Sequence, residues 1–416
     1  MSKTKTFLWR DWAPVQFASL CRALPLLLIL AALITAAAPS QAQSNFTVIH
    51  NFTGPDGAYP ESTPTLDRRG NVYGTTYWGG ASWAGLVYEL AHIDGSWILY
   101  RLHSFTGVSD GGAPWAEVAF SPDGALFGTT SMAGGPQRYG TLFKVTPPAN
   151  TVCMVALCPW IETTLHSFDG SDGADSRASV VFDSQGNLYG TTYSGGTYAG
   201  GTVYKATLSG GTWNVSVIYS FNPSVGADDG YWPLGKVVLD SAGNLYGTTS
   251  RGGAYDDGTV FELSPSEGGW TETILHSFAE SGSFPRGGLV FDRAGHLYGV
   301  SQYMVFQLSP KGSVWNFTPI YTLLGSLHTL SIDAADNLYG TAVGGGTYGY
   351  GTVFELSPSG GGWTYTDLYD FTDGNDGGAP WGGVAVTGPG GYLYGTTTYG
   401  GTDDRGVIYQ INLGGR

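Results

Sequence analysis

The chain has 416 residues, 66 of them glycine, with 14% aromatic and only 12% charged residues. Such a composition is typical of short strands joined by tight turns, and it excludes a mainly helical or disordered chain. The formal net charge of −15 leaves no basic surface for a phosphate backbone, which excludes nucleic acid as a partner.

Residues 1–42 have the pattern of a secretion signal. An uncharged, mostly apolar run at 23–38 follows a basic segment, and Ser40 and Ala42 are small residues where a signal peptidase reads them. An uncleaved membrane anchor is the alternative, but this run of 16 residues is shorter than the roughly 20 that span a bilayer. We expect cleavage after Ala42 and a secreted or periplasmic protein without a membrane span. Residues 43–416 then hold 14 Lys/Arg and 32 Asp/Glu, a net charge of about −18.

The chain after residue 42 consists of one unit repeated seven times. The phrase Gly-Asn-Leu-Tyr-Gly-Thr-Thr at 243–249 recurs, with variation, around Tyr73, Phe127, Tyr189, Tyr246, Tyr298, Tyr339 and Tyr394. Two further phrases, Gly-Thr-Val-Phe-Glu-Leu and one ending in Leu-His-Ser-Phe, also recur with it. In the fourth unit these phrases predict strands a to d at 235–240, 244–250, 258–264 and 270–278. Seven such units predict an all-β fold, a seven-bladed β-propeller with four antiparallel strands per blade.

The two ends of the repeated region predict how the ring closes. The first strand after the signal, at 46–52, is of the d type, and the last strand, at 406–413, is of the c type. We expect the N-terminal strand to complete the last blade, so that no sheet edge stays free.

Repeats of the form GNLYGTT-x-x-GG-x4-GTVFEL resemble the GloVer, or Gloeo_Verruco, tandem-repeat family of secreted bacterial proteins. The resemblance covers essentially all of the chain after residue 42. It implies an extracellular location and no particular catalytic residues. Because no sorting motif or hydrophobic tail precedes Arg416, we expect a released or periplasmic protein.

Several polar residues are interpreted as structural. The His of strand d alternates with Tyr between units, so we expect no metal or charge requirement there. Cys153 and Cys158 are expected to form a local disulfide in the second blade. No cofactor is expected. Asp169, Asp172 and Asp175 are weak candidates for a Ca²⁺ site, and plain Asp-Gly turns are the preferred interpretation of that segment.

The candidate ligand-binding residues lie in the d–a and b–c loops, which share one face of a propeller. The residue that follows a repeated Pro or Ser differs from blade to blade and is predicted to ring the channel mouth: Glu61, Trp115, Arg177, Leu234, Arg286, Leu327 and Trp381. Trp232, Trp78 and Trp83 complete the candidate set. Trp rings stack on sugars and Arg binds carboxylates, although Trp115 and Trp381 have an equal alternative as packing between blades. Short segments at 301–303 and 323–326 predict a notch in this rim that gives a long polymer an exit.

Two classes of function remain open at this point. The first is a non-catalytic binding or scaffold propeller, expected as a monomer, that recognises a polysaccharide or a cell-surface protein. The second is a carbohydrate-active enzyme, a glycoside hydrolase or polysaccharide lyase, on the same fold. Because no blade carries an obvious catalytic motif, the sequence favours binding.

Overall fold

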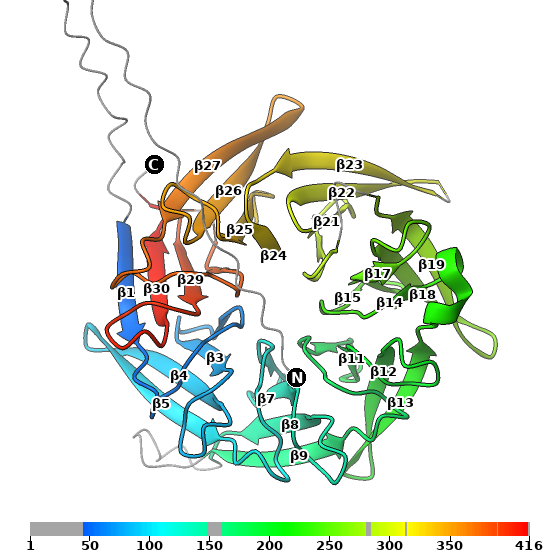
Figure 1. Ribbon diagram of the computed structural model, residues 1–416, viewed down its shortest axis with the longest axis horizontal. Coiled ribbons are helices and arrows are strands. Elements are labelled where there is room, and N and C mark those ends of the chain that lie inside the picture. Colours follow the sequence, from blue (N-terminus) through cyan, green and yellow to red (C-terminus); the bar gives the residue numbers. More distant parts are fainter. Residues whose placement is uncertain (1–44, 149–159, 280–283, 313, 389, 415–416) are drawn as a thin grey trace, which may run out of the picture. The chain divides into compact units, whose positions relative to one another are not determined.

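The computed structural model describes residues 45–148, 160–279, 284–312, 314–388 and 390–414. Seven four-stranded antiparallel sheets are arranged around a centre (Figure 1), which confirms the predicted seven-bladed β-propeller. Blade 1 consists of β2 Thr65–Leu66, β3 Val72–Thr76, β4 Leu86–Ile93 and β5 Ser96–Ser104. Blade 2 consists of β6 Ala119–Phe120, β7 Leu126–Thr130, β8 Thr141–Thr146 and β9 Ile161–Ser167. Blade 3 consists of β10 Val181–Phe182, β11 Leu188–Thr192, β12 Thr202–Ser209 and β13 Thr212–Ser220.

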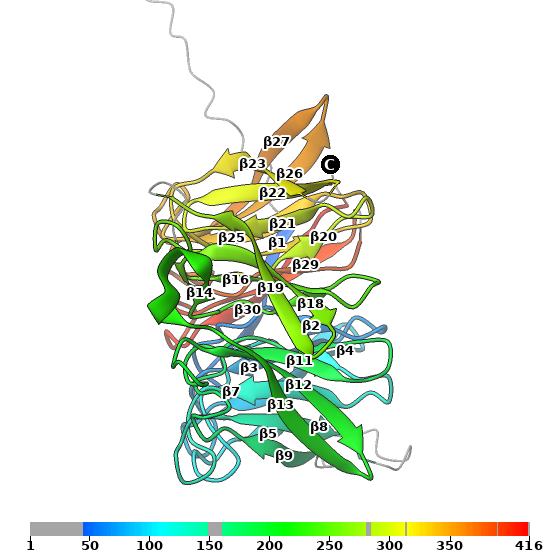
Figure 2. The ribbon, with the colours of Figure 1, turned by 90° about the vertical axis from the view of Figure 1, so that its right-hand side faces the viewer.

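Blades 4 to 7 follow in chain order. Blade 4 consists of β15 Val238–Leu239, β16 Leu245–Thr249, β18 Thr259–Ser266 and β19 Gly269–Ser277, and blade 5 of β20 Val290–Phe291, β21 Leu297–Val300, β22 Met304–Lys311 and β23 Val314–Thr322. Blade 6 consists of β24 Ser326–Ile332, β25 Leu338–Val343, β26 Thr352–Ser359 and β27 Gly362–Asp370. Blade 7 consists of β28 Ala385–Val386, β29 Tyr392–Thr397, β30 Val407–Asn412 and β1 Asn45–Asn51. A small ladder of β14 Gly230–Tyr231 and β17 Arg251–Gly252 adds to blade 4. The helix η1 Pro223–Asp228 lies beside β14 at one face of the molecule (Figure 2).

The ring closes as predicted. Strand β1 pairs antiparallel with β30, from Asn45 opposite Asn412 to Asn51 opposite Val407, and the two strands lie side by side in Figure 1. The ring of Phe46 stacks on Tyr369 of blade 6 at 3.8 Å between centroids. The first strand of the described chain therefore joins blade 7 to blade 6.

Each part of the recurring phrase has a structural role within its blade. In blade 4, Asp240 accepts hydrogen bonds from the backbone N–H groups of Ala242 and Asn244 at 2.8 and 2.9 Å, and from the Tyr246 hydroxyl at 3.2 Å. Asp240 thus caps the turn between strands a and b. Gly247 must lack a side chain, because a Cβ there would lie 2.5 Å from the ring of Phe261. The phrase recurs because every blade repeats this turn and this packing.

The first Thr of the phrase bonds to the next blade instead of its own. Thr248 Oγ1 donates to the carbonyl of Gly287 at 2.9 Å, and Thr396 Oγ1 donates across the ring closure to Ser62 at 3.1 Å. This explains one difference from the predicted strands. Strand a is only two residues long in six blades, since the residues before it bond to the neighbouring blade. At the boundary of blades 5 and 6, Val300 replaces the Thr.

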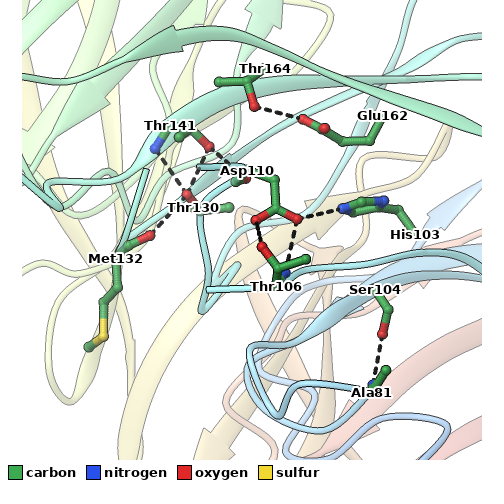
Figure 3. A network of polar contacts seen from close by, with 10 residues as sticks. All are labelled: Ala81, His103, Ser104, Thr106, Asp110, Thr130, Met132, Thr141, Glu162 and Thr164. Atoms are coloured by element: carbon green, nitrogen blue, oxygen red, sulfur yellow. Dashed lines mark hydrogen bonds and ion pairs between the residues drawn. The ribbon is translucent and has the colours of Figure 1, made fainter. Parts of the chain in front are cut away.

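In five blades the His or Tyr of strand d pairs with an Asp of the loop that follows it. His103 lies 3.2 Å from Asp110, which also accepts from the backbone N–H of Thr106 at 2.9 Å (Figure 3). In blade 6 the hydroxyl of Tyr369 donates the corresponding hydrogen bond to Asp376, at 3.0 Å. Burial lowers the pKa of His103 despite its Asp partner. These histidines are structural, as the sequence indicated.

A buried carboxyl pair lies at the boundary of blades 3 and 4, and it predicts how stability changes with pH. Burial, together with the charge of Asp229, raises the pKa of Glu272 to about 8, and burial raises that of Asp229 to about 6. The folded protein therefore keeps a proton that the unfolded chain releases near pH 4.5. Since the unfolded state then binds fewer protons, the free energy of unfolding should fall as the pH rises from about 5 to about 8.

Glu272→Gln should remove this loss. We expect it to raise the free energy of unfolding by about 2 kcal/mol near pH 8 and to leave it almost unchanged near pH 5, as measured by urea unfolding. The matched control is Glu267→Gln, in the exposed turn between β18 and β19, which should change neither value. A Glu272→Gln protein with the wild-type pH dependence would refute the role of the pair.

Two predicted features lie outside the described residues: the signal at 1–42, and the pair Cys153 and Cys158. The cleavage and the disulfide stay predictions. Among the residues that the structure does describe, no helix has the length and apolar character needed to cross a membrane.

Candidate functional site

A backbone kink in the d–a loop aims one side chain of each blade at the channel mouth. In six blades a residue other than glycine adopts a positive φ two positions before that side chain: Tyr59, Ala113, Asp175, Trp232, Phe284 and Ala379, with φ between 51° and 63°. Neighbouring loops hold this strained residue from both sides. The N–H of Trp232 donates to Gly200 of blade 3 at 2.8 Å, and its carbonyl accepts from Ser250 at 3.1 Å. Strain fixed in this way is a frequent feature of functional sites.

The kinks of six blades, together with strand β24 of blade 6, place one residue of each blade around one opening. The channel lining contains Glu61, Trp115, Arg177, Leu234, Arg286, His328 and Trp381, in blade order. Above it lies a cavity of about 420 Å³, which the loop residues Tyr193, Trp232, Arg251 and Phe284 also line. We call this cavity the mouth. Its volume falls in the range of about 300–1,000 Å³ that is common for small-molecule sites.

Three arginines lie at the mouth, two of them against aromatic faces. The guanidinium of Arg177 lies 4.5 Å from the ring centre of Tyr193 and 5.1 Å from that of Trp115, and its Nε bonds to Asp175 at 2.9 Å. Arg251 lies 4.4 Å from the ring centre of Phe284. Arg286 also lines the mouth, without a hydrogen bond or ion pair to any other described residue. Asp175 and Asp256 form ion pairs with Arg177 and Arg251, so Arg286 is the arginine of the mouth whose charge no described carboxylate pairs.

Two polar groups of the channel lining lack partners within the described chain. The Oε2 of Glu61 and the Nε2 of His328 are buried without a hydrogen bond. Burial raises the pKa of Glu61 to about 7, although the charge of Arg177 opposes this. Burial, with a contribution from the charge of Arg286, lowers the pKa of His328 to about 3. His328 is therefore neutral at physiological pH, whereas Glu61 titrates there.

The channel narrows below the mouth. Its lining continues with a layer of small residues, including Gly235, Gly287 and Gly382, around a cavity of about 110 Å³. A Cβ on Gly287 would lie 1.8 Å from the carbonyl oxygen of His328, so strands a approach each other closely here. In the next layer Lys236 of blade 4 forms an ion pair with Glu117 of blade 2. Both residues also line the cavity at the opposite opening, so the pair lies between the two ends of the channel.

One predicted mouth residue was wrong. Leu327 is only 1% exposed and belongs to the core cluster of blade 6, and His328 lines the mouth in its place. The reason is the strand: β24 pairs along its whole length, from Ser326 opposite Val343, and its register shifts between Leu327 and Leu330. The spacing of Leu327, Leu330 and Ile332 breaks strict alternation, which is the signal that would have revealed this shift.

The structure separates the remaining candidates. Trp232 stacks on Tyr193 at 5.5 Å in the mouth. Trp78 and Trp83 do not line it: Trp78 contacts Tyr77, and Trp83 lies 5.3 Å from the guanidinium of Arg405 on the outer rim.

The three Ca²⁺ candidates serve the turn and the mouth. Asp169 and Asp172 accept backbone N–H bonds within their turn, and Asp175 binds Arg177. No group of three acidic, His or Cys side chains with metal-binding geometry occurs among the described residues. Calcium binding stays an untested prediction.

Sequence reasoning missed Tyr193, Arg251 and Phe284. Tyr193 directly follows a Thr-Thr pair, and Arg251 is one residue further on in its own blade. These two positions vary between units just as the predicted mouth position does. The sequence variation at positions next to the repeated phrase was thus the signal that could have identified these residues.

The fold and this opening define the class of the molecule: a seven-bladed propeller whose channel has a cationic, aromatic mouth. The chain belongs to the Gloeobacter/Verrucomicrobia repeat family, whose model matches residues 35–157 and 157–331. The resemblance of the repeats to this family is thereby confirmed. No curated protein matches the chain in sequence.

Solved structures share the fold at low sequence identity. An inactive variant of virginiamycin B lyase from Staphylococcus aureus, solved with quinupristin, has a TM-score of 0.55 at 14% identity, over 88% of this chain and 99% of that one. The extracellular domain of a protein assigned as a one-component system from B. thetaiotaomicron has a TM-score of 0.57 at 11% identity, over 88% of this chain and 40% of that one. PorZ, a surface component of the type-IX secretion system of Porphyromonas gingivalis, has a TM-score of 0.52 at 14% identity, over 88% of this chain and 48% of that one. At such identities the similarity shows the fold alone.

Proposed function

We propose that this protein is an exported binding propeller that recognises a carboxylated saccharide at the mouth. The observation that carries the proposal is the arrangement of Arg177, Arg251 and Arg286 among aromatic rings on a strongly acidic protein. Arginine binds carboxylates in a bidentate geometry, and aromatic faces stack on the apolar faces of sugar rings.

The carboxyl groups of the channel support binding over hydrolysis. Glycosidases generally use two carboxyl groups that flank the bond to be cleaved. Here Asp175 binds Arg177 and Glu117 binds Lys236, so Glu61 is left as the unengaged carboxyl of the described channel lining. His328, with its lowered pKa, is a weak base.

Export is part of the proposal. It rests on the pattern of residues 1–42, on the extracellular domain from B. thetaiotaomicron, and on the surface location of PorZ.

Calorimetric titration with trigalacturonate, and with a neutral galactose trimer of the same linkage, tests the proposal. We expect binding of the acidic trimer alone, weakened by salt. The double variant Trp115→Ala, Trp381→Ala should abolish it, whereas Trp83→Ala on the outer rim should not. Equal affinity for both trimers, or no effect of the double variant on a folded protein, would overturn the proposal. Mass spectrometry of the incubated ligand detects turnover, which would favour the enzyme instead.

Glu61 predicts that affinity depends on pH. The carboxylate of a uronic acid stays ionised above about pH 5, whereas Glu61, with a pKa of about 7, gains its charge as the pH rises through that value. The new charge repels the ligand and competes for Arg177. Affinity should therefore fall about tenfold between about pH 6 and pH 8.

Glu61→Gln should make affinity independent of pH over this interval. The matched control is Glu162→Gln: burial also raises the pKa of Glu162 to about 7. This residue lies in strand β9, accepts a hydrogen bond from Thr164 (Figure 3) and lines neither cavity. It should keep the wild-type profile. The same pH profile in Glu61→Gln as in the wild type would show that Glu61 does not act on the ligand.

A further inference from the structure

The closed channel determines how much of a long ligand can enter the mouth. Lys236 and Glu117 form their ion pair below the constriction, between the two cavities of the channel. Because this pair joins blade 4 to blade 2 across the channel, it obstructs the course of a polymer through the ring. One end of the polymer can occupy the mouth, and the rest of the chain then leaves over the rim on the same face.

The loops that form the rim around the mouth are shortest at blades 5 and 6. The b–c turn of blade 5 consists of Ser301–Tyr303, and only Leu323–Gly325 link β23 to β24. The corresponding link from β27 to β28 runs from 371 to 384. The two short segments lie together, because the N–H of Leu323 donates to the carbonyl of Tyr303 at 2.9 Å. We call this low sector the notch.

Exposed aromatic side chains border the notch. Tyr303 is 43% exposed, and Tyr348 and Tyr350, in the b–c loop of blade 6, are 52% and 46% exposed. The Tyr303 hydroxyl accepts a hydrogen bond from the side chain of Gln302 at 2.7 Å, which orients its ring. On the inner side, the rings of His328 in blade 6 and Trp381 in blade 7 lie 4.5 Å apart in the mouth. Aromatic rings thus occur both in the mouth and in the exposed loops of blades 5 and 6.

We infer that the ligand is a carboxylated polysaccharide, bound by one end in the mouth, whose chain leaves through the notch and stacks on Tyr303, Tyr348 and Tyr350. The inference rests on the proposed function and adds the length, direction and further subsites of the ligand. Two features favour this occupant: the arginines and aromatic rings that line the mouth, and the ion pair of Lys236 and Glu117, which obstructs the course through the ring.

A series of galacturonate oligomers from dimer to hexamer tests the inference by calorimetric titration. Affinity should rise about tenfold with length and then level off, because stacking on two or three rings contributes a gain of this size. Tyr303→Ala, Tyr348→Ala should reduce the hexamer to the affinity of the dimer and leave the dimer unchanged. The matched control is Tyr198→Ala, Tyr255→Ala, which removes rings of similar exposure on blades 3 and 4 and should have no effect.

The two proposals fail in different ways. Equal affinity for all lengths, or an equal loss in the control variant, would overturn the path through the notch, while Arg286→Gln would still weaken every oligomer. Absence of binding at all lengths would overturn the proposed function and the inference together.

Discussion

A chain that begins at residue 54 should unfold at a temperature at least about 10 °C lower than one that begins at residue 43. The shorter chain lacks β1, the strand d of blade 7, and exposes the backbone edge of β30. It also loses Phe46, stacked on Tyr369, and the fully buried Phe52. Removing a buried Phe side chain alone costs about 3–5 kcal/mol. Differential scanning calorimetry of the two chains measures the effect.

A control separates closure from a general loss of packing. Ile161→Thr changes a side chain of strand β9 that is 62% exposed, and it should leave the unfolding temperature within about 2 °C. If both chains unfold at the same temperature, the ring does not depend on the N-terminal strand.

Replacing Arg177 and Arg286 together by Gln should weaken trigalacturonate binding more than about 100-fold. A charge-assisted hydrogen bond to a carboxylate contributes about 1.5–3 kcal/mol, and two are removed. Arg286→Gln alone should cost about tenfold. This single variant is the cleaner test, because Arg177 also holds Trp115 and Asp175 in place. Calorimetric titration at fixed ionic strength measures both variants.

Arg405→Gln is the matched control. This arginine also lies against aromatic rings, 5.4 Å from the centre of Tyr59 and 5.3 Å from that of Trp83, but it does not line the mouth. Its loss should change affinity less than about twofold. A comparable loss in this control would mean that overall charge, and not the mouth, attracts the ligand.

The fold was predictable because the same local physics acts seven times. The Asp240 turn, the close packing at Gly247 and the bond from Thr248 to the next blade each require particular residues at fixed spacing. Such requirements leave a repeated pattern in the sequence. Strand a was predicted too long, since its first residues bond to the neighbouring blade, and no pattern within one unit shows which partner a carbonyl has.

The mouth was predictable only in part. Trp115 and Arg177 each stand 12 residues before the aromatic residue of the repeated phrase, Phe127 and Tyr189, so their position followed from alignment of the units. His328 did not, because the register shift in β24 moves the side chain by one position. Arg251 and Phe284 come from loops whose course depends on contacts between segments far apart in the chain.

A crystal structure of the protein with trigalacturonate tests the central claim most directly. The claim predicts the ligand in the mouth, with a carboxylate on Arg286 or Arg177 and a sugar ring against Trp115 or Trp381. Ligand bound only at the opposite opening, beyond the ion pair of Lys236 and Glu117, or an empty mouth at saturating ligand, would contradict it.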